Sequence, residues 1–156
     1  MTEGPERART IEDENMPLID NQGHFHAQTD QPVAVDLTQL QPGQRLPTAI
    51  AIANDVSVDA LLPSLGGVTV ITIDFPSFAD GRGFSLARRL RDADYRGTLH
   101  ASGHIISDQL RHAFACGFNA IVIDDALAAR QPETVWREAA KSALPSYQKH
   151  LRMVAA

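Results

Sequence analysis

Short apolar runs recur along the chain from residue 31 onward and predict the strands of a single sheet. Several runs are apolar almost throughout instead of alternating with polar residues, which is typical of strands that are covered on both faces. The five runs are PVAVDL (32–37), AIAIAND (49–55), VTVITID (68–74), GTLHAS (97–102) and AIVIDD (120–125).

Segments with a helical spacing of apolar residues follow the later runs. They cover residues 57–65, 85–93, 107–117 and 132–144. Strands that alternate with helices at about 25 residues per unit indicate right-handed crossovers and a parallel sheet. The sequence therefore predicts an α/β fold. We expect a small, mainly parallel sheet with flanking helices, built either as an open three-layer sheet or as a half-barrel.

The connection between the first two runs departs from this pattern. Residues 37–48, LTQLQPGQRLPT, contain Pro42, Gly43 and Pro47, and no crossover helix fits there comfortably. We therefore expect the first strand to run antiparallel or to lie at an edge of the sheet.

The N-terminal segment differs from the rest of the chain in composition. Residues 1–30 lack periodic apolar positions and predict a mobile leader in front of a single α/β domain over residues 31–156. Seven acids and two arginines place the whole net charge of −5 in this leader. The stretch MPLID (16–20) is an alternative, since it is able to add a short edge strand. His24 and His26 lack the third ligand of a metal site.

Charge, hydropathy and cysteine content exclude several classes of protein. A neutral body behind an acidic leader offers no basic face for nucleic acid. No run approaches the eighteen or so apolar residues of a membrane span, and the polar N-terminus is unlike a secretory signal. Cys116 is the only cysteine, which excludes a disulfide or a dithiol pair within one chain. We expect a cytoplasmic protein without a nucleic-acid or membrane partner.

Polar side chains stand where several predicted strands end. Asp55, Asp74, Asp124 and Asp125 follow apolar runs, and His104 follows another. The carboxyl ends of parallel strands share one edge, where ligands of α/β proteins bind. Such a group would hold a magnesium ion or act as acid and base. The alternative is structural, because an aspartate after a strand commonly caps the next helix. We expect no metal site, with Asp74 and Asp124 as the ligands if one exists.

The stretch DGRGFS (80–85) forms the most distinctive turn of the sequence, and Ser85 stands where a helix N-cap belongs. Its two glycines allow close approach of the backbone to a ligand, and a helix N-terminus attracts anions. The guanidinium of Arg82 suits a face of two oxygens. The turn predicts a site for sulfate, sulfite, phosphate or a carboxylate. The alternative is a structural turn in which Arg82 pairs with Asp80 or Asp74.

Other conspicuous side chains favour structural roles. Arg88, Arg89 and Arg91 are interpreted as the solvated face of a helix. Cys116 lies near the end of an apolar helix face and predicts a buried thiol. Trp136 predicts either core or docking surface.

Three stretches together resemble the bacterial domain-of-unknown-function family 934. They are ITIDFPSFADGRGFSLARRLR, YRGTLHASGHIISDQL and ACGFNAIVI. Members of that family carry the pattern I-x-[FL]-x-x-F-x-D-G-R-G-[FY]-S-x-A-x-x-L-R, then G-x-[LI]-R-A-x-G, a D-Q pair and R-C-G-F. The resemblance covers about residues 31–125 and implies a role in sulfite reduction.

The resemblance also selects residues. Carried over by position, the shared polar residues of the family are Asp80, Arg82, Ser85, Asp108 and Gln109. This sequence departs from the family at His100 and Ala115, where relatives have arginine, which implies less positive charge for an anion. Together with the strand ends, the candidate ligand-binding and anion-binding residues are Asp74, Asp80, Arg82, Ser85, His104, Asp108 and Gln109.

Three hypotheses for the function stay open. The resemblance implies an accessory factor or oxidoreductase of assimilatory sulfite reduction, which binds an oxyanion at residues 80–85 or docks on sulfite reductase or another sulfur-assimilation protein. The second hypothesis is a small metal-assisted enzyme at the carboxyl edge. The third is a non-catalytic interaction module that binds a partner or forms a homodimer. The sequence holds no cysteine cluster and no nucleotide fingerprint, so it names neither a cofactor nor a catalytic residue.

Overall fold

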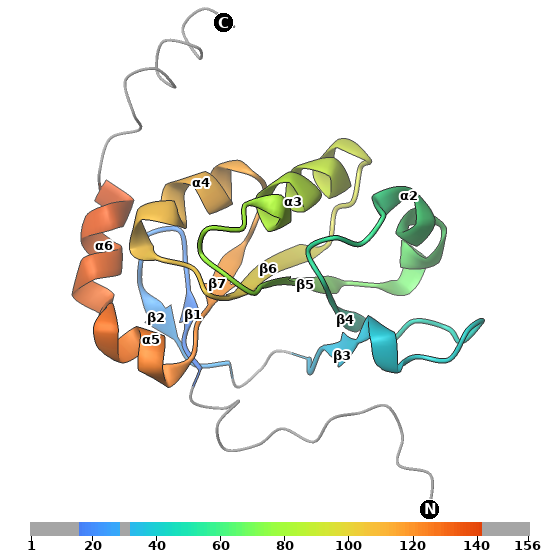
Figure 1. The fold of residues 1–156 in the computed structure, drawn as a ribbon, viewed down its shortest axis with the longest axis horizontal. Helices are drawn as coiled ribbons and strands as arrows, with labels where there is room; N and C mark the ends of the chain where they lie inside the picture. The colour runs from blue at the N-terminus through green and yellow to red at the C-terminus, as the bar shows by residue number, and fades with distance from the viewer. Residues whose placement is uncertain (1–15, 29–31, 142–156) are drawn as a thin grey trace, which may run out of the picture.

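The computed structural model describes residues 16–28 and 32–141. Its centre is a seven-stranded sheet in the order β2-β1-β7-β6-β5-β4-β3 (Figure 1). Neighbouring strands from β3 to β7 are parallel, whereas β1 runs antiparallel to β2 and β7. The predicted α/β fold class is confirmed. The strands are β1 (Leu18–Ile19), β2 (Phe25–His26), β3 (Val35–Asp36), β4 (Ala49–Ile52), β5 (Val70–Phe75), β6 (Thr98–Gly103) and β7 (Ala120–Val122).

The helices that connect consecutive strands cover one side of the sheet. The helical segments are η1 (Leu37–Gln39), α2 (Val58–Leu61), η2 (Leu62–Gly67), α3 (Arg82–Asp92), η3 (Ser107–Gln109), α4 (Leu110–Ala115), α5 (Asp125–Arg130) and α6 (Glu133–Lys141). Figure 1 shows α2, α3 and α4 on the same side. Each strand from β4 to β7 lies next to the one before it in the chain, always on the same side. Because the crossovers between parallel strands are right-handed, their helices then all lie on one face of the sheet. This arrangement is that of an open half-barrel and not of a three-layer sheet.

Strand β3 corrects one expectation and confirms another. It lies at the edge of the sheet, but it runs parallel to β4, with Val35 opposite Ile50. A parallel connection needs about a dozen residues, and residues 37–48 provide them through η1 and a loop without an α-helix. Because β3 is parallel, Asp36 lies at the same edge of the sheet as the other strand-ending aspartates.

Residues 16–28 belong to the sheet, although the sequence predicts a mobile leader over residues 1–30. Leu18 of β1 lies opposite Val122 of β7, and β2 forms the outer edge beside β1. The alternative that MPLID forms a strand is confirmed. A strand of two residues is too short to produce a hydrophobic period, so composition alone favoured a leader. Residues 1–15 lie outside the described residues.

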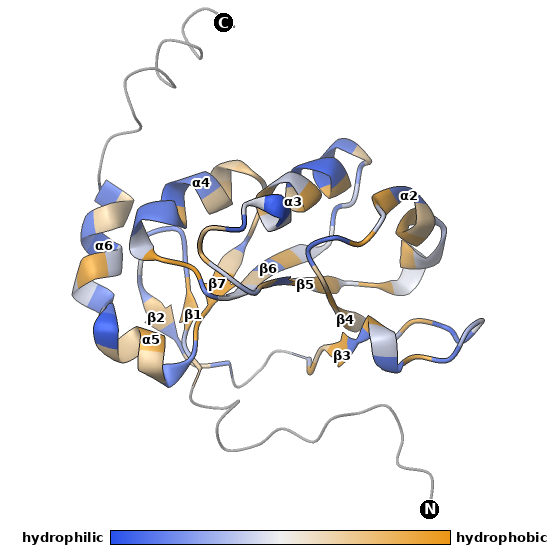
Figure 2. Ribbon diagram, in the orientation of Figure 1, coloured by the Kyte–Doolittle hydropathy of each residue, from blue (hydrophilic) through white to orange (hydrophobic). Residues whose placement is uncertain are grey.

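The core lies between the sheet and the helices on it. Ile71, Ile73 and Phe75 alternate along β5 and are buried, as is Leu90 of α3. The ring of Phe75 lies 4.9 Å from that of Phe84 in α3. Figure 2 shows apolar strands, whereas the outer surface of α3 is polar. No helix in the described part of the chain is long and apolar enough to cross a membrane.

Trp136 and Cys116 both lie in the interior. Trp136 of α6 is fully buried and donates from Nε1 to the carbonyl of Gln131 at 2.9 Å, so it is core and not docking surface. Cys116 is buried, as predicted, and desolvation raises the pKa of its thiol.

Candidate functional site at the carboxyl edge

The carboxyl ends of the parallel strands share one edge of the sheet, and the polar residues predicted from the sequence lie along it. Across the sheet they are Asp55 after β4, Asp74 in β5, His104 after β6 and Asp124 after β7, and the parallel direction of β3 adds Asp36. All five side chains are exposed. The predicted common edge is therefore present, spread over five strands.

The candidate metal ligands do not form a cluster. Asp74 and Asp124 belong to strands that are separated by β6. The carboxylate of Asp124 accepts a hydrogen bond from the N–H of Leu127 at 2.7 Å and caps α5. Within residues 16–28 and 32–141, no group of three or more His, Cys, Asp or Glu side chains is arranged to hold a metal ion. The structural alternative is confirmed for Asp124.

The guanidinium of Arg82 faces Asp80. Its Nε and Nη2 donate to the two carboxylate oxygens at 3.0 and 2.8 Å, and the backbone N–H of Arg82 donates to Oδ1 at 3.2 Å. Hydrogen bonding from Arg82 is the main reason that the pKa of Asp80 lies well below its usual range. The same hydrogen bond raises the pKa of Arg82. The oxyanion hypothesis requires this face of Arg82 to bind an anion. In the structure, the carboxylate of Asp80 occupies it.

The start of α3 differs from the expectation. The helix begins at Arg82 with Gly81 as its N-cap, so Ser85 lies inside the helix, exposed, and is not the cap. The N–H of Arg82 bonds instead to the carboxylate of Asp80. Gly83 is buried, and a Cβ added there would come within 2.8 Å of Cε1 of Phe75. The second glycine of the turn therefore allows α3 to pack closely on β5.

Gln109 fixes the loop over residues 76–81, which we call the Phe78 loop. Its Nε2 donates to the carbonyl of Phe78 at 2.8 Å, and its Oε1 accepts from the N–H of Ile106 at 3.1 Å. Both ends of the amide bond within the chain, so this candidate ligand residue has a structural role. Asp108, its neighbour in η3, is exposed.

Phe78 is a candidate that sequence reasoning missed. Its side chain is 58% exposed, more than Val33 or Val135, the other large apolar residues exposed in the described ranges. Within the loop, the N–H of Asp80 donates to the carbonyl of Ser77 at 3.0 Å. An aromatic ring is therefore held in solvent on a backbone that is fixed at several points.

Asn54 was also missed. It directly follows the apolar run of β4 and is only 7% exposed. Its Nδ2 is buried and makes no hydrogen bond of normal length in the described structure. The amide lies near enough to Asp80 to help to lower the pKa of that carboxyl. The signal available in the sequence was a polar residue immediately after a buried strand.

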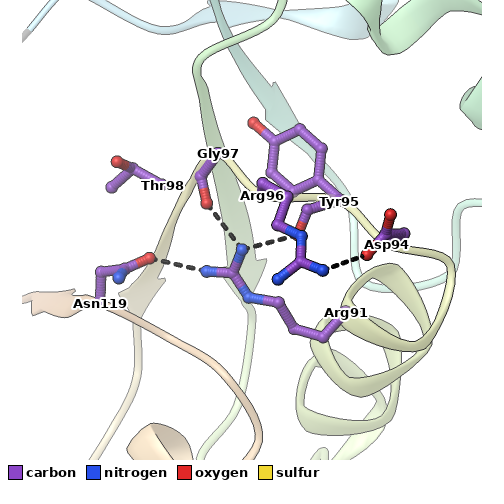
Figure 3. Close-up of a pocket in the computed structure, with 7 residues that line it drawn as sticks. All are labelled: Arg91, Asp94, Tyr95, Arg96, Gly97, Thr98 and Asn119. Atoms are coloured by element: carbon purple, nitrogen blue, oxygen red, sulfur yellow. Dashed lines mark hydrogen bonds and ion pairs between the residues drawn. The ribbon is translucent and has the colours of Figure 1, made fainter.

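The amino edge of the sheet contains a cavity of about 460 Å³ beside Arg91 (Figure 3). All five N–H groups of Arg91 are used. They donate to the carbonyls of Tyr95, Gly97 and Gly117 and to Oδ1 of Asn119, at 2.7 to 3.0 Å. Arg91 is thus not part of a solvated face, which corrects the expectation. We call these five residues the Arg91 network.

Comparison with known families assigns the chain. The family described as bacterial protein of unknown function (DUF934) matches residues 49–155. The protein belongs to the DUF934 family. Searches of curated proteins and of solved structures gave no match.

The residues of the family motif in this DUF934 protein make specific contacts within the fold. In the DGRGFS block, Asp80 and Arg82 bind each other and Gly83 packs on Phe75. Gln109 of the D-Q pair holds the Phe78 loop. His100, which stands where the resemblance implies arginine, is buried in β6, and desolvation lowers its pKa. The residues of the DGRGFS block and Gln109 therefore shape and support the loop.

Proposed function

We propose that this DUF934 protein is a non-catalytic accessory factor of assimilatory sulfite reduction. It docks through the Phe78 loop on sulfite reductase or on another sulfur-assimilation protein. The exposed ring of Phe78 on a fixed loop is the observation that supports docking. The pathway comes from the family resemblance.

Two physical properties of the loop favour binding to a protein. Buried aromatic anchors supply much of the energy of protein interfaces. A loop that is already ordered loses little conformational entropy when it binds. Gln109 fixes the carbonyl of Phe78, and the pair of Asp80 and Arg82 fixes the end of the loop. The backbone that carries the ring is therefore ordered before a partner arrives.

The test measures binding of purified sulfite reductase from the native host to the immobilised full chain. Phe78→Ala should weaken binding by at least about 10-fold and leave the unfolding midpoint unchanged. Val135→Ala, which removes another exposed apolar side chain on α6, is the matched control and should bind like the wild type. A wild-type chain that does not bind, in a host whose deletion strain grows normally on sulfate, would overturn the proposal.

Oxyanion binding at residues 80–85 is a second candidate, favoured by the amide nitrogen of Asn54, which is buried beside Asp80 and makes no hydrogen bond of normal length. Sulfite or sulfate would then draw hydrogen bonds from Asn54, the N-terminus of α3 and Arg82, after Arg82 has released Asp80. Calorimetric titration with sulfite and sulfate tests this candidate. Arg82→Ala should abolish the heat of binding, whereas Arg88→Ala on the exposed side of the same helix should not. Unchanged affinity in Arg82→Ala would rule it out.

A further inference from the structure

The two edges of the sheet carry opposite charge. The segments that leave the carboxyl ends of β3 to β7, up to the first turn of the next helix, hold eight aspartates and one arginine, Arg82. Within the described residues, the segments that enter the amino ends of β3 to β7 hold five arginines and two aspartates. The eight acids are Asp36, Asp55, Asp59, Asp74, Asp80, Asp108, Asp124 and Asp125, and the five arginines are Arg45, Arg88, Arg89, Arg91 and Arg96.

Part of the acidic charge has no cation beside it. Asp74, Asp108 and Asp125 are exposed, and none of them forms an ion pair with another residue of the described ranges. Asp80 is paired with Arg82, whereas Asp36 and Asp124 cap helices. Like charges at one edge raise the local negative potential and attract positive groups from solution.

Phe78 lies within this acidic edge. Asp74 precedes the Phe78 loop at the end of β5, and Asp80 closes it. The hydrogen bond from Gln109 to the carbonyl of Phe78 brings η3, and with it Asp108, beside the loop. Asp74, Asp80 and Asp108 therefore all belong to the segments that carry or hold the exposed ring.

We infer that the surface receiving this loop is an apolar pocket framed by lysine and arginine side chains of a partner protein. The inference rests on the proposed docking function and adds the chemistry of the partner. The ring fills the pocket, while Asp74 and Asp108 face the basic rim. Opposite charges at such a rim accelerate association and reject acidic partners.

The first experiment measures the association rate with sulfite reductase in low and high salt. The double variant Asp74→Asn/Asp108→Asn should associate about 3- to 10-fold more slowly than the wild type in low salt, and the difference should shrink as salt rises. The control Asp92→Asn/Asp94→Asn removes the same net charge at exposed positions on the opposite, amino edge and should associate at the wild-type rate. Binding that depends on neither salt nor the Asp74 and Asp108 pair overturns the inference but leaves the docking function intact.

The second experiment does not depend on sulfite reductase. A short leucine–lysine peptide and a leucine–glutamate peptide of equal length are titrated separately into the full, 15N-labelled chain. The basic peptide should shift backbone amide signals of residues 74–82 and 104–109, and the acidic peptide should not. A basic peptide that shifts these signals when sulfite reductase does not bind supports the acidic docking surface and overturns the proposed partner. No shift at these residues, or equal shifts with both peptides, overturns the inference.

Discussion

At the amino edge of the sheet, one arginine donates five hydrogen bonds to three backbone carbonyls and the side-chain oxygen of Asn119, whereas at the carboxyl edge a phenylalanine and several aspartates are exposed to solvent. Both edges are built from turns between strands and helices. At the amino edge the charged group is used to hold backbone carbonyls of three different positions together. At the carboxyl edge the internal hydrogen bonds fix the loop but leave its ring uncovered.

This difference separates the part of the molecule that stabilises the fold from the part that is available to a partner. A cavity lies beside the Arg91 network, yet its arginine has no N–H group left for a ligand. The Phe78 loop does not line this cavity, but it carries the most exposed large apolar side chain of the described residues. A hollow in the surface is therefore a poorer guide to function here than an exposed side chain on a fixed backbone.

The largest loss of stability is expected when the Arg91 network is broken. Arg91→Lys keeps the positive charge but loses the planar set of five donors, so several carbonyls lose their partner. We expect a loss of about 2–4 kcal/mol in the free energy of unfolding. The measurement is urea denaturation of the full chain. Arg89→Lys, which is exposed on the same helix, should change the unfolding free energy by less than about 0.5 kcal/mol, and equal losses in the two variants would contradict the comparison.

The next largest loss of stability is expected at Gly83, in the turn at the carboxyl edge. Gly83→Ala places a methyl group against the ring of Phe75, which is 1% exposed and also packs on Phe84. We expect a loss of about 2–3 kcal/mol, because the ring has little room to move. Gly81→Ala is the matched variant in the same motif. Its Cβ would meet only Cδ2 of Phe84, at 4.0 Å, and its cost at the N-cap should stay below about 1 kcal/mol. A larger loss in Gly81→Ala would show that the turn, and not helix packing, needs glycine.

The sequence was sufficient for those parts of the fold that have a hydrophobic period. Strands β4 to β7 and the helices α3, α4 and α6 were predicted because their apolar residues repeat over several turns or positions. Strands β1 and β2 were not, since two residues define no period and pairing with distant β7 decides their conformation. Helix α5 was missed for a related reason. It has no fully buried residue, and its start is fixed by Asp124.

The candidate site was predicted by type of residue but not by role. Arg82 and Gln109 were named as ligand residues, yet each of them bonds within the chain. Arg91 and the exposed Arg89 are the same type of residue on the same helix, so the sequence does not distinguish them. The carbonyl of Gly117 that Arg91 binds lies 26 residues away along the chain. Phe78 carries no local pattern that tells an exposed ring from a buried one. Partners distant in sequence, and not local preference, decide these cases.

A smaller effect on the free energy of unfolding is expected below pH 7 and comes from His100 in β6. Its folded-state pKa is lowered by burial, so the unfolded chain binds the proton more readily. Stability is therefore unaffected well above the unfolded pKa of about 6.5 and falls as the pH drops below it. His100→Gln should flatten the slope of unfolding free energy against pH between about 5 and 7. An unchanged slope in His100→Gln would contradict the assignment.

The smallest effect, and one of opposite sign, is expected at Asp94 beside the Arg91 network. Asp94 has a φ of 71°, the only positive φ of a non-glycine residue in the described ranges, and it follows the last turn of α3. Glycine adopts this conformation without strain, so Asp94→Gly should stabilise the fold by up to about 1 kcal/mol. The ion pair with Arg96 offsets little, because both side chains are largely exposed. Asp92→Gly, two residues earlier and still helical, should instead destabilise by about 1 kcal/mol. Thermal unfolding of the two variants should give shifts of the unfolding midpoint with opposite sign. Such a result would show that the backbone at Asp94 is strained, although the Arg91 network beside it is fully hydrogen-bonded.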